Sequence, residues 1–318
     1  LFEGNAGRAY RVVVHDMVNF NPGGAGGAGI DFANFSVVGG DCLACWVYNI
    51  GPVALGLASV HGIYTSHAGA NILNNVVYGC QNGWGVHLWH NARAQLVANN
   101  LCFANGSGGI TVAADAPTYP VSDYNVVCNN ISRDGGDGII EYGYGSNTGS
   151  HNTYEANDCY DVTYDGYLVY NGEVWANGLA VDAGFVNFQS DGSGDYSLGA
   201  SSTLIGQGWA PGAPAIDHNG YYRPGISGVS LGPYEYRVSG VWVPPTPRTL
   251  WLLNAAGVAT AAVAGVLNPA QAAASAWRTA LTLVLPAPPP PPLVANLSAG
   301  GPFRSGQAVL VRLRHPIT

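Results

Sequence analysis

Aromatic, histidine and aspartate residues recur at fixed offsets from a repeating glycine in the first half of the sequence. The glycines are Gly62, Gly85, Gly109, Gly138 and Gly166. One before, two after or four after them lie the candidate binding residues His61, Tyr64, Trp84, His87, Trp89, Tyr142 and Tyr170. Aromatic rings stack on sugars and imidazoles bind hydroxyls, so this set predicts a glycan-binding face. Packing against another subunit and incidental exposure remain alternatives.

Asp137 and Asp165 occupy the position before two successive glycines and form the candidate catalytic pair. If the repeats stack as neighbouring strands, the two carboxylates lie about 5 Å apart. Such a pair could supply the acid and the base of glycoside hydrolysis, and the His and Tyr side chains could instead carry a proton in a lyase. A carboxylate beside a glycine corner is also typical of an Asx turn, so a binding face without catalysis stays open.

The residue types and their spacing disfavour a metal site or a cofactor site. His61, His67, His87 and His90 could gather, but no Cys, Asp or Glu stands at ligand spacing from them, so we expect no metal site. The Cys42-Leu-Ala-Cys45 motif has no second cysteine pair and no βαβ context, which disfavours zinc or redox chemistry. No cofactor is expected, and the absence of lysine excludes a Schiff-base mechanism.

The elements that must position these residues are repeats of 25 to 30 residues. The repeats are marked by four paired sites, Asn74-Asn75, Asn99-Asn100, Asn129-Asn130 and Asn157-Asp158. Each repeat has short β-rich runs, no helical periodicity, and Asn or Gly at corners that need a left-handed backbone, which favours coils of a β-solenoid. We expect stacked Asn side chains to form a ladder.

The same register predicts a core and an outer column. The residue after each glycine should face the core, which gives the column Ile63, Val86, Ile110 and Ile139. The residue two after each glycine should face solvent. The six cysteines, near or within these strands, suit a tightly packed core, and their disulfide state stays open.

The motif from His61 to Tyr64, followed by Asn71 to Val77, resembles the coil pattern of the right-handed parallel β-helix superfamily. That superfamily includes pectate-lyase-like enzymes, mannuronan epimerases and phage tailspikes, and the resemblance covers about residues 25–236. It implies an all-β, right-handed parallel β-helix but not one function, because this scaffold hosts many activities. There is no close match to the polygalacturonase motifs. The few arginines of this region disfavour a pectate-lyase mechanism, which in the family uses a basic proton acceptor and calcium.

Charge divides the chain into two parts. Only 9% of the 318 residues are charged; all acidic residues precede Arg237, and the remaining tail carries six Arg and no carboxylate. We predict a β-helix over residues 1–236, in which the first coil is already in progress at the start and a C-terminal cap lies near 212–236. A Pro-rich linker over 237–247 and a small basic β-rich module over 248–318 follow, and a polyproline spacer at 286–292 interrupts the module.

These observations predict an extracellular, cell-surface or virion-associated structural protein that binds a surface polysaccharide, of tailspike-like or fibre-like type. A secreted polysaccharide lyase or glycoside hydrolase using the same groove is the alternative, and a ligand-free scaffold is a further one. We expect a homo-oligomer or larger assembly formed through the C-terminal module. Scattered arginines and an acidic body disfavour nucleic acid, and no apolar run reaches the length of a membrane span.

Overall fold

The computed structural model describes residues 4–238 except 19–25, 35, 52–59, 115–120, 144–147, 165, 169–174 and 226, together with five short strands of the tail. The tail strands are β22 (Thr249–Leu253), β23 (Ala259–Ala262), β24 (Leu281–Thr282), β25 (Val294–Asn296) and β26 (Arg312–Arg314), which pair antiparallel. The expected polyproline spacer and nearly all of the expected linker fall outside the described residues, and the domain boundaries stay predictions.

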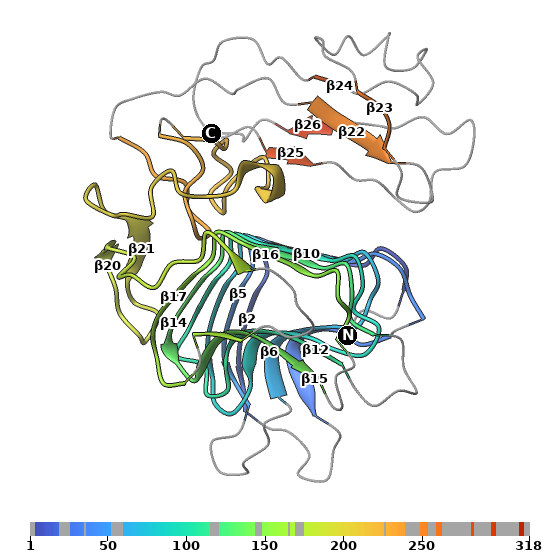
Figure 1. Ribbon diagram of the computed structural model, residues 1–318, viewed down its shortest axis with the longest axis horizontal. Helices are drawn as coiled ribbons and strands as arrows, with labels where there is room; N and C mark the ends of the chain where they lie inside the picture. The colour runs from blue at the N-terminus through green and yellow to red at the C-terminus, as the bar shows by residue number, and fades with distance from the viewer. Residues whose placement is uncertain are drawn as a thin grey trace.

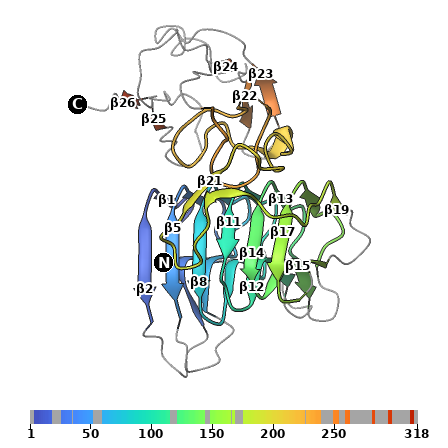
Figure 2. The same cartoon turned by 90° about the vertical axis from the view of Figure 1, so that its left-hand side faces the viewer.

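Three parallel sheets form the body, and the chain visits them in turn (Figures 1 and 2). Sheet A contains β1 (Arg8–Tyr10), β4 (Asp41–Leu43), β7 (Asn71–Leu73), β10 (Leu96–Ala98), β13 (Val126–Cys128), β16 (Thr153–Glu155) and β19 (Trp175–Ala176). Sheet B contains β2 (Val13–Met17), β5 (Trp46–Ile50), β8 (Val76–Cys80), β11 (Leu101–Phe103), β14 (Ile131–Gly135) and β17 (Asp158–Val162). Sheet C contains β3 (Gly27–Phe32), β6 (Val60–Thr65), β9 (Trp84–Leu88), β12 (Gly108–Ala114), β15 (Asp137–Gly143) and β18 (Tyr167–Leu168). The predicted all-β parallel solenoid is confirmed.

A ladder of buried asparagines joins the coils at the corner between sheets A and B. Its members are Asn75, Asn100, Asn130 and Asn157, and each Nδ2 donates to the Oδ1 of the next at 2.9 Å. Each Oδ1 also accepts a backbone N–H from the preceding coil, and each Nδ2 reaches a carbonyl of sheet A at 2.8–2.9 Å. The ladder therefore satisfies the backbone groups that the turn leaves without a sheet partner.

The residue before each ladder position has a left-handed backbone. Asn74, Asn99 and Asn129 have φ of 57°, 56° and 57°, as the sequence predicts for a sharp corner. The fourth predicted pair is shifted by one residue: Asn157 occupies the ladder position, and Ala156, with φ of 49°, takes the corner. The prediction that Asn157 and Asp158 form the fourth pair was wrong by one residue, because the corner position tolerates Ala.

The repeating glycines have a different role from the one that the sequence suggests. Gly62, Gly85, Gly109 and Gly138 lie within the strands of sheet C, where sheets B and C approach each other. A Cβ on Gly62 would overlap Val77, and one on Gly109 would overlap Ser132. Glycine is therefore required by close packing, not by a corner.

The predicted core column after these glycines is confirmed, since Ile63, Val86, Ile110 and Ile139 are fully buried. In the outer column, Tyr64 and His87 are half-buried. Thr111 and Ile140 of the same column are only 1% and 5% exposed, so the prediction that they face solvent is wrong.

All six cysteines are free thiols and all are buried. Cys42, Cys45, Cys80, Cys102 and Cys159 belong to the core that sheets A, B and C enclose. Burial raises the pKa of the Cys128 thiol to about 12, which keeps it protonated at neutral pH.

Residues 177–238 pack on the outer face of sheet B. A hairpin of β20 (Phe185–Asn187) and β21 (Asp195–Leu198) contributes to an apolar cluster with the outward side chains of sheet B, including Tyr78, Phe103 and Ile131. In Figure 2 the yellow part of the chain lies along the stacked coils. The segment also contains the 3-10 turn η1 (Ala210–Gly212).

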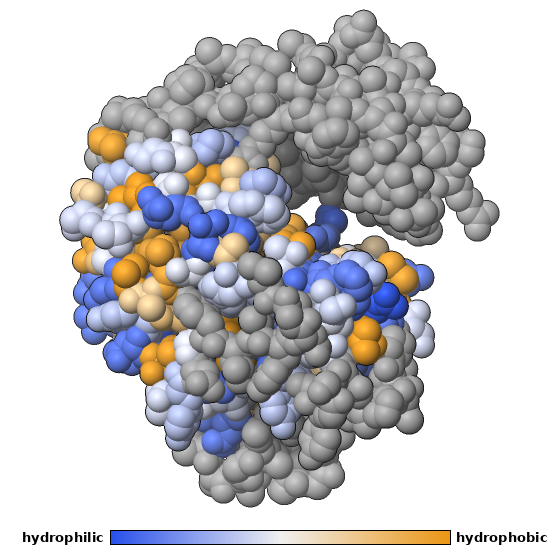
Figure 3. Space-filling model, in the orientation of Figure 1, coloured by the Kyte–Doolittle hydropathy of each residue, from blue (hydrophilic) through white to orange (hydrophobic). Residues whose placement is uncertain are grey.

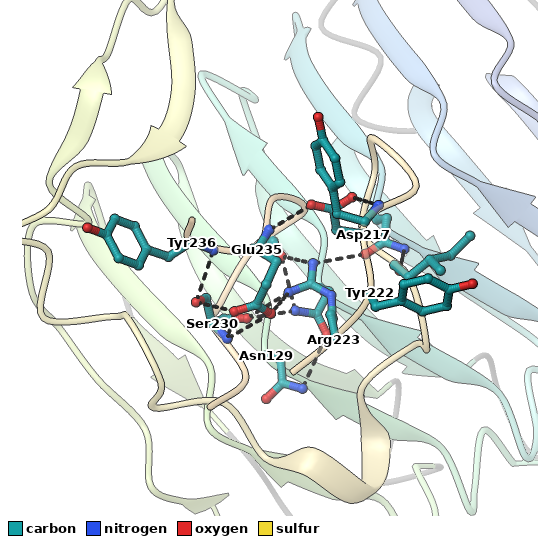
Figure 4. A network of polar contacts seen from close by, with 12 residues as sticks. Asn129, Asp217, Tyr222, Arg223, Ser230, Glu235 and Tyr236 are labelled. Atoms are coloured by element: carbon teal, nitrogen blue, oxygen red, sulfur yellow. Dashed lines mark hydrogen bonds and ion pairs between the residues drawn. The ribbon is translucent and has the colours of Figure 1, made fainter. Parts of the chain in front are cut away.

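Arg223 holds the end of this segment against the coils (Figure 4). Its fully buried guanidinium pairs with Glu235 at 2.9 Å and donates to Asn74 Oδ1 at 3.2 Å. The segment reaches from Arg11, which donates to the His218 carbonyl, to Asn129, which accepts from the Trp209 N–H. These contacts are lateral, and the expected covering of the last coil by residues 212–236 stays a prediction.

Replacing Asn100 with Ala should destabilise the solenoid strongly. The change removes two acceptor and two donor contacts from a fully buried site, and each buried polar group left without a partner costs about 1–3 kcal/mol. We expect urea unfolding followed by circular dichroism to show a loss of about 3 kcal/mol or more. The matched control is Asn187→Ala on β20, whose exposed side chain bonds Gln189 alone among the described residues and which should change stability by less than about 0.5 kcal/mol. Equal effects of the two variants would contradict the ladder's role.

Replacing Arg223 with Ala should leave the Glu235 carboxylate buried without its cation. We expect a loss of about 3–5 kcal/mol in the same unfolding measurement. Arg8→Ala is the control, because Arg8 pairs with Asp41 at the surface and such pairs contribute about 1 kcal/mol or less. If Arg223→Ala is as mild as Arg8→Ala, the lateral segment is not held by this ion pair.

Candidate glycan-binding site

The outer face of sheet C gathers five of the predicted binding residues. Strands β6 and β9 pair with Tyr64 opposite His87, and His61 and Trp84, three residues earlier on the two strands, are joined by a hydrogen bond. Trp89 follows β9, and its backbone N–H donates to the Thr65 carbonyl at 3.1 Å. Two consecutive coils thus bring together His61, Tyr64, Trp84, His87 and Trp89, hereafter the sheet C cluster. Residues at the same position in successive repeats lie side by side, because the strands of successive coils pair in parallel and in register.

Two histidines at the centre of the sheet C cluster are joined by a hydrogen bond. His61 Nε2 lies 2.8 Å from His87 Nδ1, and the Trp84 backbone N–H donates to His61 Nδ1 at 3.1 Å. His61 is only 3% exposed, whereas His87 is half-buried. Burial lowers the pKa of His61 to about 3. Burial, followed by the neighbouring His61 and His90, lowers the pKa of His87 well below its usual value.

Aromatic rings surround this pair. The His61 ring stacks on Tyr64 with centroids 6.0 Å apart, and Tyr64 meets His87 edge-on at 5.5 Å. Trp89 lies 5.1 Å from His87 on the other side. Half-buried rings next to imidazole nitrogens offer both a stacking surface and hydrogen bonds, a combination suited to a sugar.

The Trp84 ring occupies space that is free because the neighbouring residue is a glycine. The residue opposite it on β12 is Gly108, and a Cβ at that place would overlap the Trp84 ring. Gly108 in turn pairs with Asp137 on β15, so Trp84 leans across the gap in the column toward the next coil. Gly108 therefore leaves the room that the Trp84 ring occupies.

The remaining predicted residues are less closely connected to the sheet C cluster. Asp137 is half-buried on β15, in the column predicted for it, and Tyr142 is 49% exposed on the same strand. Asp165 and Tyr170 lie outside the described residues, so the predicted pairing of Asp137 with Asp165 stays a prediction. Tyr142 lies opposite Ala113, and Thr111 and Ile140 continue the column of His87 without aromatic or charged groups.

A separate groove of about 560 Å³ lies where the strands of sheet B end, away from the predicted residues. It is lined by Asp134 and Asp161 on neighbouring coils, by Gln81 and Asn105, and by Tyr164, which is 73% exposed. The two aspartates share a left-handed backbone with φ of 51° and continue the corner column of Asn49 and Gly79. Asp at such a corner is accounted for by turn geometry.

A second aromatic column, which the sequence analysis missed, runs along the outer face of sheet B. The rings of His15, Tyr48, Tyr78 and Phe103 stack at 5.0, 4.9 and 4.7 Å with nearly parallel planes. The column continues with Arg133, whose guanidinium lies 3.8 Å from the Phe188 ring centre. Tyr78, Phe103 and Arg133 each come three residues after a ladder asparagine, a signal that the sequence contains. Apart from the exposed His15, this column packs under residues 177–238 and is structural.

The described part of the chain shows neither a metal site nor a membrane-spanning helix. Hydrophobic and hydrophilic residues are interspersed on the face in Figure 3. Among the described residues, no group of three or more His, Cys, Asp or Glu could hold a metal ion. No helix there is long and apolar enough to cross a membrane.

Comparison of the chain with protein-family models, with curated proteins and with solved structures finds no match. The fold and the site together define the class of protein, a parallel β-solenoid with an aromatic and histidine-rich outer face.

Proposed function

We propose that the sheet C cluster binds a polysaccharide and that the protein is an extracellular, cell-surface or virion-associated binding protein of tailspike-like or fibre-like type. The observation that carries this proposal is the grouping of Tyr64 and Trp89 around a hydrogen-bonded histidine pair, which Trp84 joins through its backbone N–H. The cluster spans two neighbouring strands of a flat sheet, which suits a short stretch of an extended sugar chain.

The coils give such a surface the rigidity that binding needs. The cluster lies on strands whose backbones are fixed by parallel pairing, and the asparagine ladder holds the same coils together at the corner between sheets A and B. Little conformational entropy is therefore lost when a sugar binds. The assembly that would present this surface many times is a homo-oligomer formed through the C-terminal module, which remains part of the proposal.

Polysaccharide cleavage is the second candidate function. It is favoured by one observation, the contact of Tyr64 with an uncharged His87, because a neutral imidazole beside a tyrosine can exchange a proton with a substrate. Release of new reducing ends or of unsaturated uronates from a polysaccharide would establish this function in place of pure binding.

Binding to a panel of capsular and plant polysaccharides tests the proposal. We expect Trp89→Ala to weaken the binding of a panel ligand about three- to tenfold, through loss of ring stacking, in affinity electrophoresis or calorimetry. Tyr164→Ala, in the separate groove, is the matched control and should leave the affinity unchanged. If Tyr164→Ala weakens binding and Trp89→Ala does not, the groove is the binding site, and absence of binding to every polysaccharide refutes the proposal.

A further inference from the structure

The hydrogen bonds of the histidine pair determine where its protons lie. The Trp84 backbone N–H can only donate, so His61 Nδ1 accepts and carries no proton. His61 must then carry its proton on Nε2, from which it donates to His87 Nδ1. His87 therefore accepts at Nδ1 and carries its own proton on Nε2. The described residues provide no protein partner for that Nε2–H.

The same geometry keeps His87 uncharged. A second proton on His87 would lie on Nδ1 and face the His61 Nε2–H across 2.8 Å, which would replace a hydrogen bond by a repulsion. Burial supports this arrangement, since it lowers the pKa of both imidazoles. The pair thus offers one fixed, neutral N–H donor at any pH near neutrality.

Among the residues that the structure describes, the ionisable groups around His87 supply no fixed positive charge to the face. Strand β6 contributes His61 and Tyr64, and β3 contributes Asp31, which pairs with Tyr64 in the column of His87. Strand β12 places the neutral Thr111 beside His87, and β15 carries Asp137. His90, after β9, is the remaining histidine close to His87. Arg93 follows at the corner, where its guanidinium lies 5.9 Å from the Tyr124 ring centre.

We propose that the sheet C cluster selects neutral polysaccharides over polyuronates, with His87 as the residue that determines this specificity. The proposal rests on the proposed glycan-binding function and names its ligand class. The His87 Nε2–H donates to a hydroxyl or ring oxygen, while Trp84 and Trp89 stack on the sugar. A uronate carboxylate would lose its hydration here without a cation among the described residues to replace it, on a face whose flanking strands carry the acidic residues Asp31 and Asp137.

A binding panel divided by ligand charge tests this selectivity. The full chain is titrated with neutral galactomannan and dextran and with polygalacturonate and alginate, at pH 5 and at pH 8. Binding confined to neutral polysaccharides, with the same affinity at both pH values, supports the proposal. Preference for the uronates overturns the proposal but leaves the glycan-binding function standing. Binding of neither kind overturns the function itself.

His61→Ala supplies a gain-of-binding test. The change frees His87 Nδ1 and opens space for water beside the ring, so both burial and the neighbouring imidazole lower the pKa of His87 less, and a larger share of this imidazole should be charged at pH 5. We expect the variant to bind uronates at least about fivefold more tightly at pH 5 than at pH 8, because a charged imidazole can pair with a carboxylate. His15→Ala, on sheet B, is the control and should bind no uronate at either pH. A folded His61→Ala variant whose uronate binding does not depend on pH contradicts the proposal.

The protonation state can also be read in the unaltered protein, which decides the question if His61→Ala does not fold. Two-bond ¹H–¹⁵N correlation spectra distinguish the two neutral imidazole tautomers and the charged form. We expect both His61 and His87 to show the neutral Nε2–H tautomer at pH 5 and at pH 8. A charged His87 or an Nδ1–H tautomer at either pH would overturn the assignment.

Discussion

Hydrogen bonding between buried asparagine side chains on successive coils is the interaction on which this structure depends. A central member such as Asn100 makes four hydrogen bonds, two as acceptor and two as donor, and the side-chain bond repeats from Asn75 through Asn100 and Asn130 to Asn157. The ladder fixes the height of each coil relative to the next and satisfies polar groups at a turn where no strand pairing exists. Charged side chains could not take this place, since stacked like charges would repel and would be buried. The low charge content of the body is consistent with this constraint.

The proposed site is a consequence of the same register. With each coil held at a fixed height, residues at equal offsets form straight columns, so His61 meets Trp84 and Tyr64 meets His87. Gly108 then leaves the space that Trp84 occupies. Proton positions follow from this backbone: one N–H of β9 determines the tautomer of His61, and His61 determines that of His87. Binding chemistry at the surface is thus linked to the packing of the coils.

Much of the fold could be predicted from the sequence because every coil repeats the same local rules. The core column from Ile63 to Ile139, the corner asparagines and the grouping of His61 with His87 follow from periodicity alone. The role of the glycines could not be predicted, because it depends on the distance between sheets B and C. Lateral packing by Arg223 was also beyond prediction, since its partner Asn74 is 149 residues away in sequence. The hydrogen bond between His61 and His87 and the tautomers of the two rings could not be predicted either, because they depend on the positions of individual atoms.

Amide hydrogen exchange at the ladder tests the central claim most directly. The backbone N–H groups of Cys45, Asn75, Asn100 and Asn130 donate to side-chain oxygens rather than to strand partners. Exchange measured by NMR or mass spectrometry should show these four amides as strongly protected as the central amides of sheet C. Exchange at rates typical of exposed turns would show that the coils are not held by the ladder, and would contradict the account.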